Sequence, residues 1–206
     1  MKARTILNIG VTAIFAVVVA TVTLIGVRGA AASRPKSLPE LGSVPEFTLV
    51  EASGQALARS DLREKVWVAS FIFTRCAEVC PAMMRTEVKL QRELPVRDDV
   101  KLVTFSVDPE HDTPAVLREY AATFGVNRAG WWLVTGKKEE IYRLALEGFR
   151  LSTMDADPAK EMPILHSTKL VLVDRRGTIR GYYDSTDEGE VRQLVKDLRA
   201  VLAERS

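Results

Sequence analysis

The chain is poor in the residues that bind soft metals or form cross-links, because its 206 residues include only two cysteines and two histidines. The cysteines are Cys76 and Cys80, which stand four positions apart in TRCAEVCP. Two thiols this close can share one metal ion or oxidise to one disulfide, so we expect this segment to hold the chemistry of the protein. A purely structural disulfide is disfavoured, because so short a ring restrains little of the unfolded chain.

An excess of charge of one sign is also missing. The 29 basic residues are nearly balanced by 27 acidic ones, the net charge is +2, and the two signs are interspersed along the chain. Nucleic-acid binding requires a basic stripe, so nucleic acid is excluded as a partner. The sequence shows no internal repeat and no low-complexity tract, which leaves an ordinary globular domain as the main body of the chain.

Charge is absent altogether from Thr5 to Val27, a run of 23 residues. At about 1.5 Å per residue a helix of this length covers roughly 34 Å, enough to cross a hydrocarbon core about 30 Å thick. The run is longer than the apolar region of a cleaved signal peptide, which favours an uncleaved anchor over residues 1–29. A removed signal stays as the alternative, because Ala30–Ala32 resembles a cleavage site.

The flanks of this run predict where the protein resides. Lys2 and Arg4 favour a cytoplasmic N-terminus, although Arg28 and nearby basic residues blur that bias. No Arg- and Ser-rich amphipathic leader precedes the run, which argues against a mitochondrial transit peptide. We therefore expect a single-span protein of a bacterial inner membrane, with a linker over 30–43 and a soluble domain over 44–206 in the periplasm or otherwise outside the cytoplasmic membrane.

Hydrophobic periodicity alternates between strand and helix across this domain. The predicted strands are 66–73, 101–108, 166–174 and 178–184, and the predicted helices are 81–94, 113–124, 139–149 and 188–203. This order predicts an α/β fold, a thioredoxin-like domain preceded by an N-terminal transmembrane helix. Met83 and Met84, and the pair Trp131–Trp132 ahead of the third helix, are expected to serve in packing.

The cysteine pair follows the first predicted strand directly. In open α/β sheets, sites form beyond the carboxyl ends of the strands. Pro81 is tolerated only in the first turn of a helix, so Cys80 is expected at the helix start and Cys76 in the loop. A helix N-terminus favours thiolate over thiol, and Arg75 would add to this effect if its side chain pointed inward.

The spacing of the pair separates two kinds of chemistry. Thioredoxin-type oxidoreductases use two intervening residues, whereas here three separate the cysteines, a spacing that also lets both sulfurs hold one ion. Two thiolates and one imidazole form a soft site that favours Cu(I). His166 is the better candidate for the third ligand, since it lies at the start of a strand whose preceding loop packs beside the cysteines in thioredoxin-like domains. His111, in a polar turn, is expected to be solvated.

Three motifs in order, FIFTRCAEVCPAMM, KLVTFSVDPEHDTP and HSTKLVLVDRRG, resemble those of the Sco/SenC family of membrane-anchored copper proteins. The resemblance implies that Cys76, Cys80 and His166 are the copper ligands. It also implies that Asp108 lies near the copper and tunes the site. The family often has proline after the first cysteine where this chain has Ala77, a departure that removes no ligand.

The family resemblance implies a metallochaperone and not a metabolic enzyme. Such a protein would bind Cu(I) and Cu(II) and deliver copper to the copper A centre of cytochrome c oxidase subunit II, or keep the cysteines of that subunit reduced. Other copper carriers or thiol reductants would be further partners. A periplasmic thiol–disulfide oxidoreductase and a redox or copper sensor are the alternatives, and an imidazole at position 166 favours the chaperone, since disulfide exchange does not need it.

Overall fold

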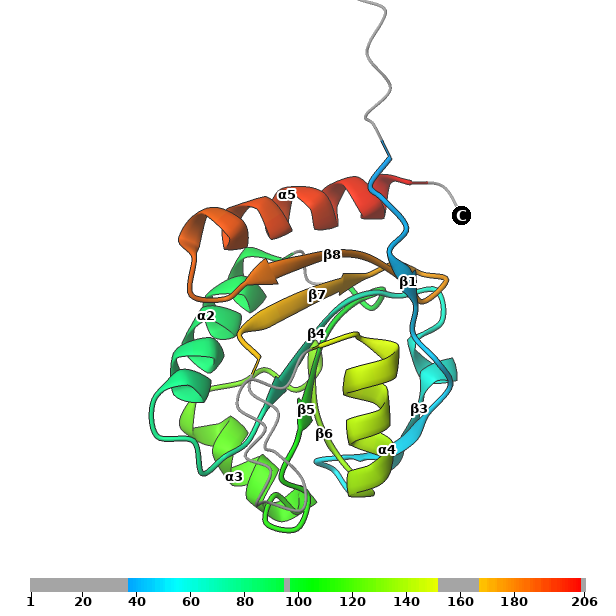
Figure 1. The fold of residues 1–206 in the computed structure, drawn as a ribbon. Coiled ribbons are helices and arrows are strands. Elements are labelled where there is room, and N and C mark those ends of the chain that lie inside the picture. The colour runs from blue at the N-terminus through cyan, green and yellow to red at the C-terminus, as the bar shows by residue number, and fades with distance from the viewer. Residues whose placement is uncertain (1–36, 95–96, 152–166, 205–206) are drawn as a thin grey trace, which may run out of the picture. The chain divides into compact units, whose positions relative to one another are not determined.

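An eight-stranded mixed sheet forms the centre of the protein in the computed structural model (Figure 1). The structure describes residues 37–94, 97–151 and 167–204. The strands are β1 (Gly42–Ser43), β2 (Thr48–Glu51), β3 (Ala56–Ala58), β4 (Val66–Ile72), β5 (Val100–Ser106), β6 (Trp131–Thr135), β7 (Lys169–Val173) and β8 (Thr178–Asp184). Their order across the sheet is β1-β8-β7-β4-β5-β6-β2-β3. Strands β4, β5 and β6 run parallel, and the remaining pairs are antiparallel.

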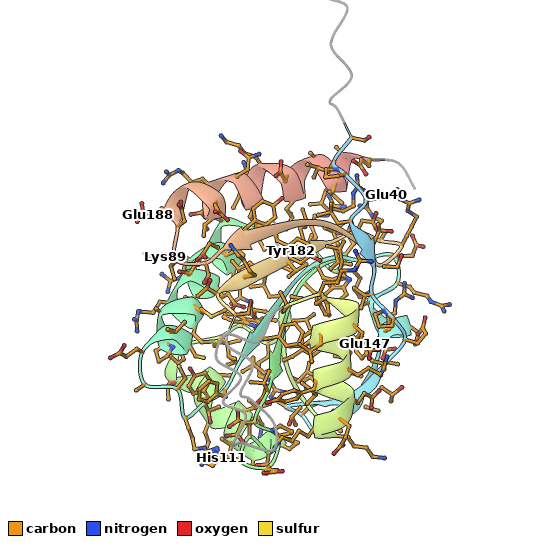
Figure 2. The ribbon with its side chains drawn as sticks, in the orientation of Figure 1. Glu40, Lys89, His111, Glu147, Tyr182 and Glu188 are labelled. Atoms are coloured by element: carbon orange, nitrogen blue, oxygen red, sulfur yellow. The ribbon has the colours of Figure 1, made fainter. Side chains whose placement is uncertain are left out.

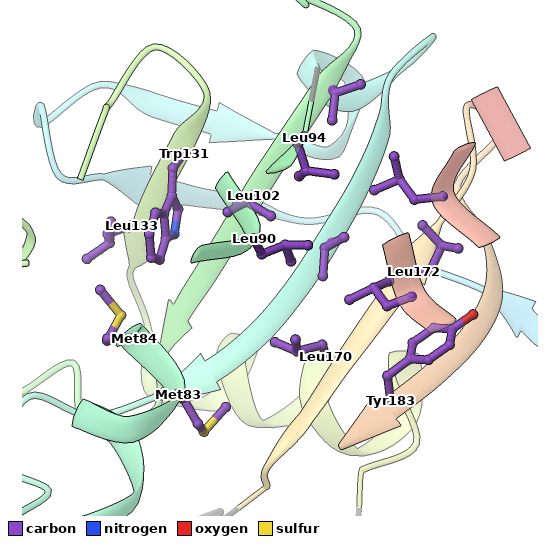
Figure 3. Packing of buried hydrophobic residues seen from close by; sticks show 14 of the residues in the cluster. Met83, Met84, Leu90, Leu94, Leu102, Trp131, Leu133, Leu170, Leu172 and Tyr183 are labelled. Atoms are coloured by element: carbon purple, nitrogen blue, oxygen red, sulfur yellow. The ribbon is translucent and has the colours of Figure 1, made fainter. Parts of the chain in front are cut away.

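Helices cover both faces of the sheet. They are η1 (Arg59–Leu62), α2 (Val79–Glu93), α3 (Pro114–Thr123), α4 (Lys138–Arg143), η2 (Leu144–Gly148) and α5 (Glu188–Ala203), of which η1 is a 3-10 helix and η2 a single π-helical segment. One buried cluster joins the sheet to α2, α3 and α5, and Figure 3 shows its methionine and leucine side chains. A second cluster joins the opposite face to α4 and η2. The molecule is therefore a three-layer α/β domain.

The two central strands, β4 and β5, are covered on both faces. All seven residues of β4 and all seven of β5 are buried, as expected for parallel strands covered on both faces. Helix α3 begins where the sequence predicts, with Thr113 as its N-cap and Pro114 in its first turn. Asp187 caps α5 by accepting hydrogen bonds from the backbone of Gly189 and Glu190. Local sequence signals thus define the elements around the site.

The α/β architecture is confirmed, but the predicted list of strands is too short. Residues 131–135, which begin with the two tryptophans, form strand β6 and not the approach to a helix. The expected packing role holds, since Trp131 is fully buried. Gly42 and Ser43, which we assigned to the linker, pair with β8, and β2 and β3 extend the other edge. Strands of two to five residues carry too few alternations for periodicity to reveal them.

The predicted membrane anchor, residues 1–29, lies outside the described residues, as does the first half of the predicted linker, residues 30–36. Within the ranges that the structure describes, none of the helices combines the length and the apolar character needed to cross a bilayer. The anchor and the choice between anchor and cleaved signal remain predictions from the sequence.

Candidate metal centre

Cys76 and Cys80 lie where the sequence places them, at the carboxyl end of β4. Cys76 is in the loop that follows the strand, and Cys80 is the second residue of α2. Both thiols are free. The backbone N–H of Cys80 donates to the Cys76 Sγ at 3.3 Å. N–H groups in the first turn of a helix have no carbonyl partner within the helix, and here one of them binds the sulfur instead.

The two thiols differ in exposure and in acidity. Burial works to raise the pKa of Cys76, but backbone N–H groups of Cys80, Glu78 and Val79 outweigh it and hold this pKa below its ordinary value. Cys80 is 4% exposed, and its burial raises the pKa of its thiol to about 12, with a further contribution from Cys76. The half-buried Cys76 is therefore the sulfur that meets a metal ion or a partner disulfide first.

The wall of the site comes from the loop between β5 and α3. Strands β4 and β5 are parallel and in register from Val66–Val100 to Ile72–Ser106, so their carboxyl ends open at the same edge of the sheet. Asp108 follows β5 and accepts two hydrogen bonds from the Arg75 guanidinium at its Oδ2, at 2.6 Å and 3.0 Å. Asp108 thus lies beside the cysteine loop, and its predicted role near the copper stays a prediction.

Arg75 does not take the inward position that would add its charge to the helix N-terminus. Its side chain is 62% exposed and pairs with Asp108 instead. The nearby carboxylate competes for the guanidinium because the parallel strands bring the two loops together. The condition for Arg75 to favour thiolate formation, a side chain that points inward, is therefore not met.

The structure tests the prediction for one of the two histidines, His111. His111 is exposed, as expected, but it is not only solvated, because its Nδ1 lies 2.9 Å from Asp112 Oδ1 and 3.3 Å from Thr74 Oγ1. His166, the predicted third ligand, lies outside the described residues. The structure therefore brings the two cysteines together, pairs Asp108 with the residue before Cys76, and leaves the position of the imidazole as a prediction.

Two buried carboxyl groups lie near the site and are not among the residues predicted from the sequence. Asp112 is fully buried and accepts the backbone N–H of Thr74 at 3.0 Å. Glu87 is fully buried under the sheet, and its Oε2 accepts hydrogen bonds from Ser70 and Thr104. Burial raises the pKa of Glu87 to about 7, with the two hydroxyl donors opposing that rise.

The sequence contains a signal for one of these two buried carboxyl groups, that of Glu87. Glu87 is four residues after Met83 and three before Leu90, so helical spacing places it on the buried face of α2. The two methionines of that face are 1% and 0% exposed and pack in the core, as predicted (Figure 3). A carboxyl group on such a face predicts either a buried polar contact or a functional group. For Asp112 the only signal was its position just before the N-cap of α3.

Comparison with known proteins defines the family of this chain. The SCO1/SenC family model matches residues 37–203. The SCO1 protein homolog of Bacillus subtilis is 30% identical over 159 residues, which cover 76% of this chain and 81% of that protein. A protein of Stutzerimonas stutzeri, described as a candidate copper-binding protein, is 30% identical over 148 residues, or 70% of this chain and 71% of its own length.

A solved structure agrees with the sequence relatives. The structure of BsSco, described as a member of the Sco family of cytochrome c oxidase assembly proteins with a disulfide switch, has a TM-score of 0.71 and 28% identity. The match covers 82% of this chain and 100% of that one. The thioredoxin-like α/β fold expected from the order of elements is consistent with these matches. With a family model spanning 37–203, the chain belongs to the SCO1/SenC family.

Proposed function

We propose that this protein binds copper and takes part in the assembly of cytochrome c oxidase. The observation that carries the proposal is the pair of free thiols at the turn from β4 to α2, one half-buried with a lowered pKa and one buried. Two sulfur donors at a partly accessible edge form a soft set of the kind that selects Cu(I). A relative described as copper-binding and a similar structure described as that of an assembly protein support this function.

The proposed copper ligands are Cys76, Cys80 and His166. Because thiolates bind the metal, copper binding requires the reduced pair, and oxidation of the pair to a disulfide releases the metal. The open position of Cys76 lets ligands of a partner approach the copper from outside. We propose the copper A centre of oxidase subunit II as the recipient, and the predicted single span of 5–27 would hold the domain outside the cytoplasmic membrane.

Thiol reduction is the second candidate function, and the asymmetry of the two cysteines favours it. The Cys76 thiolate would attack a partner disulfide, forming a mixed disulfide and releasing one partner thiolate. Cys80, losing its proton to solvent, would then attack the Cys76 sulfur and release the second partner thiolate. Two electrons pass to the partner, and the chain ends with a Cys76–Cys80 disulfide. Both candidate functions therefore need the same two sulfurs in the reduced state.

Copper titration of the reduced, full-length protein in detergent tests the proposal. We expect one copper per chain in either oxidation state. Binding should be nearly abolished in Cys76→Ala, Cys80→Ala and His166→Ala, whereas His111→Ala is the matched control and should bind as the parent does. If His166→Ala binds copper as well as the parent and the chain reduces protein disulfides with ordinary turnover, thiol reduction replaces copper binding as the function.

A further inference from the structure

The two residues before Cys76 are both held by the loop that joins β5 to α3. Thr74 donates its backbone N–H to Asp112 Oδ2 at 3.0 Å and its hydroxyl to Asp112 Oδ1. Arg75 forms its ion pair with Asp108 of the same loop. The chain segment that presents Cys76 is therefore held by side chains that lie more than 30 positions away in the sequence.

The Asp112 contact differs from the Arg75 contact in burial. Asp112 is 0% exposed, whereas the Arg75 side chain is 62% exposed and its ion pair is open to solvent and salt. Besides the two donors of Thr74, the Asp112 carboxylate accepts the hydroxyl of Ser106 at Oδ2 and lies 2.9 Å from His111 Nδ1 at Oδ1. Each oxygen thus has two partners, which offsets the cost of burying the carboxylate.

The filled hydrogen-bonding positions of the Asp112 carboxylate distinguish a structural contact from a metal site. Ligand atoms of Asp108, His111 and Asp112 lie within 4.8 Å of one another, a grouping that could suggest a second metal site. The Asp112 oxygens, however, are already occupied by hydroxyl, backbone and imidazole partners. Their geometry therefore points to a structural contact with the cysteine loop and not to an ion.

The backbone of the loop around Asp112 is held by its own hydrogen bonds. Its backbone N–H donates to the Asp108 carbonyl at 2.8 Å, and the backbone N–H of His111 donates to the same carbonyl at 3.1 Å. The next residue, Thr113, is the N-cap of α3. The short loop is therefore fixed between a fully buried strand and a helix, which makes Asp112 a rigid support for Thr74.

We infer that Asp112 is a positioning residue for Cys76. Its carboxylate fixes Thr74, the backbone N–H of Cys76 donates to the Phe73 carbonyl at 3.2 Å, and the Cys76 sulfur accepts the N–H of Cys80 at 3.3 Å. These contacts hold the two sulfurs near each other before copper or a disulfide joins them. The inference rests on the proposed function for its copper readout, although sulfur positioning can also be measured without copper.

Loss of the support would add the ordering of the loop to the cost of copper binding. Outer contacts that orient metal ligands typically change metal affinity by about 10- to 100-fold. Asp112→Asn keeps the shape of the side chain but turns an NH₂ group toward donors, so it should release Thr74. We expect copper affinity to fall by about that factor while the stoichiometry stays at one copper per chain.

The experiment compares three variants of the full-length protein by competition with a chromophoric Cu(I) chelator. Asp112→Asn should weaken binding most, and Thr74→Val, which removes only the hydroxyl, should weaken it less. Ser106→Ala is the control, because it removes a donor to the same carboxylate and the acceptor of the Asp108 backbone N–H but leaves both Thr74 contacts and the Arg75–Asp108 ion pair in place, and its affinity should stay close to that of the parent. The thiolate-to-Cu(II) charge-transfer band should shift in the first two variants only.

A second measurement needs no copper. The equilibrium between the Cys76–Cys80 disulfide and dithiothreitol reports how well the chain holds the sulfurs together, and Asp112→Asn should make the disulfide several-fold easier to reduce. If the parent binds no copper, the proposed function fails, and this equilibrium alone decides on Asp112. If Asp112→Asn does not fold, the contrast between Thr74→Val and Ser106→Ala decides.

The inference is overturned if folded Asp112→Asn matches the parent in both affinity and disulfide equilibrium. It is also overturned if Ser106→Ala weakens copper binding as much as Asp112→Asn does, because the carboxylate would then act only through general stability. If only Thr74→Val and Ser106→Ala fold, equal copper affinities of these two variants also overturn the inference.

Discussion

The two ends of the central sheet are held by different kinds of contacts. At the carboxyl end of β4, the cysteine loop is held by a buried carboxylate with uncharged backbone and hydroxyl donors and by an exposed ion pair. At the opposite end, where β1 pairs with β8, the contacts are made by a buried cation and two carboxylates. Figure 2 shows His111 and Glu40 at these two ends.

Arg180 is the centre of the second end. It is 3% exposed, and its five N–H donors match five acceptors. These acceptors are one oxygen of Asp174, both oxygens of Glu204 and the carbonyls of Leu38 and Pro39. One side chain thus ties the first described residues and the end of α5 to the sheet.

The difference shows how stability and reactivity are separated in this fold. A buried cation with all its donors satisfied holds a single geometry, and removing it leaves carboxylates uncompensated. At the cysteine end, the ion pair that holds the cysteine loop, Arg75–Asp108, is open to water, as is the Lys138–Glu110 pair of the neighbouring loop. The reactive sulfurs therefore lie at the end where a ligand can enter without breaking a buried ion pair.

Removal of Arg180 should produce the largest change in stability. Arg180→Met should lower the free energy of unfolding by about 3 to 5 kcal/mol, because breaking a buried ion pair leaves Asp174 short of a partner. Urea unfolding followed by tryptophan fluorescence measures this loss. Arg176→Gln, in the turn just before β8, is the control, since the Arg176 side chain is 63% exposed and its removal should leave the free energy of unfolding nearly unchanged. A loss below 1 kcal/mol in Arg180→Met would contradict the comparison, and copper stoichiometry of the folded fraction should be unchanged.

Glu87, between the two ends, should make stability depend on pH. Its folded pKa of about 7 lies above the ordinary value of 4.5, so the folded state binds the proton more tightly. Its contribution is full below the ordinary pKa and is lost as pH rises through about 7. In Glu87→Gln this loss is absent, so the stability of the variant relative to the parent should rise by about 2 kcal/mol from pH 5 to pH 8.

Urea unfolding of both proteins at several pH values measures this difference. Glu93→Gln is a suitable control, because Glu93 lies on the same helix but is exposed. Its stability difference from the parent should not change over the same range by more than a few tenths of a kcal/mol. A flat difference for Glu87→Gln would mean that the buried carboxyl has no unusual affinity for its proton.

The exposed ion pair at the cysteine end should have the smallest effect. Arg75→Gln should change the free energy of unfolding by less than about 1 kcal/mol, because the guanidinium is largely solvated. The change should shrink further between 0.05 M and 1 M salt, where the screening length falls to about 3 Å. A double-mutant cycle with Asp108→Asn isolates the pair, and a coupling above 2 kcal/mol that resists salt would make this contact equivalent to that of Arg180.

Much of the site was predictable because its signals are local. Pro81 limits where α2 can begin, and this placed Cys80 in the first turn and Cys76 in the loop. The run of β4, apolar except for Ser70, identified the central strand. Strand β6 was missed because five residues beginning with two tryptophans do not distinguish a strand from a helix approach.

By itself, the sequence determined where the two cysteines lie between β4 and α2, and it predicts which residues supply the chemistry. Only the tertiary structure decided which side chains hold the cysteine loop, since Thr74 and Asp112 are 38 positions apart and meet because β4 and β5 pair in parallel. Likewise, Arg180 reaches the carbonyl of Leu38 across 142 positions. Such contacts depend on strand order and register, which arise from the packing of the whole sheet and not from the spacing of neighbouring residues.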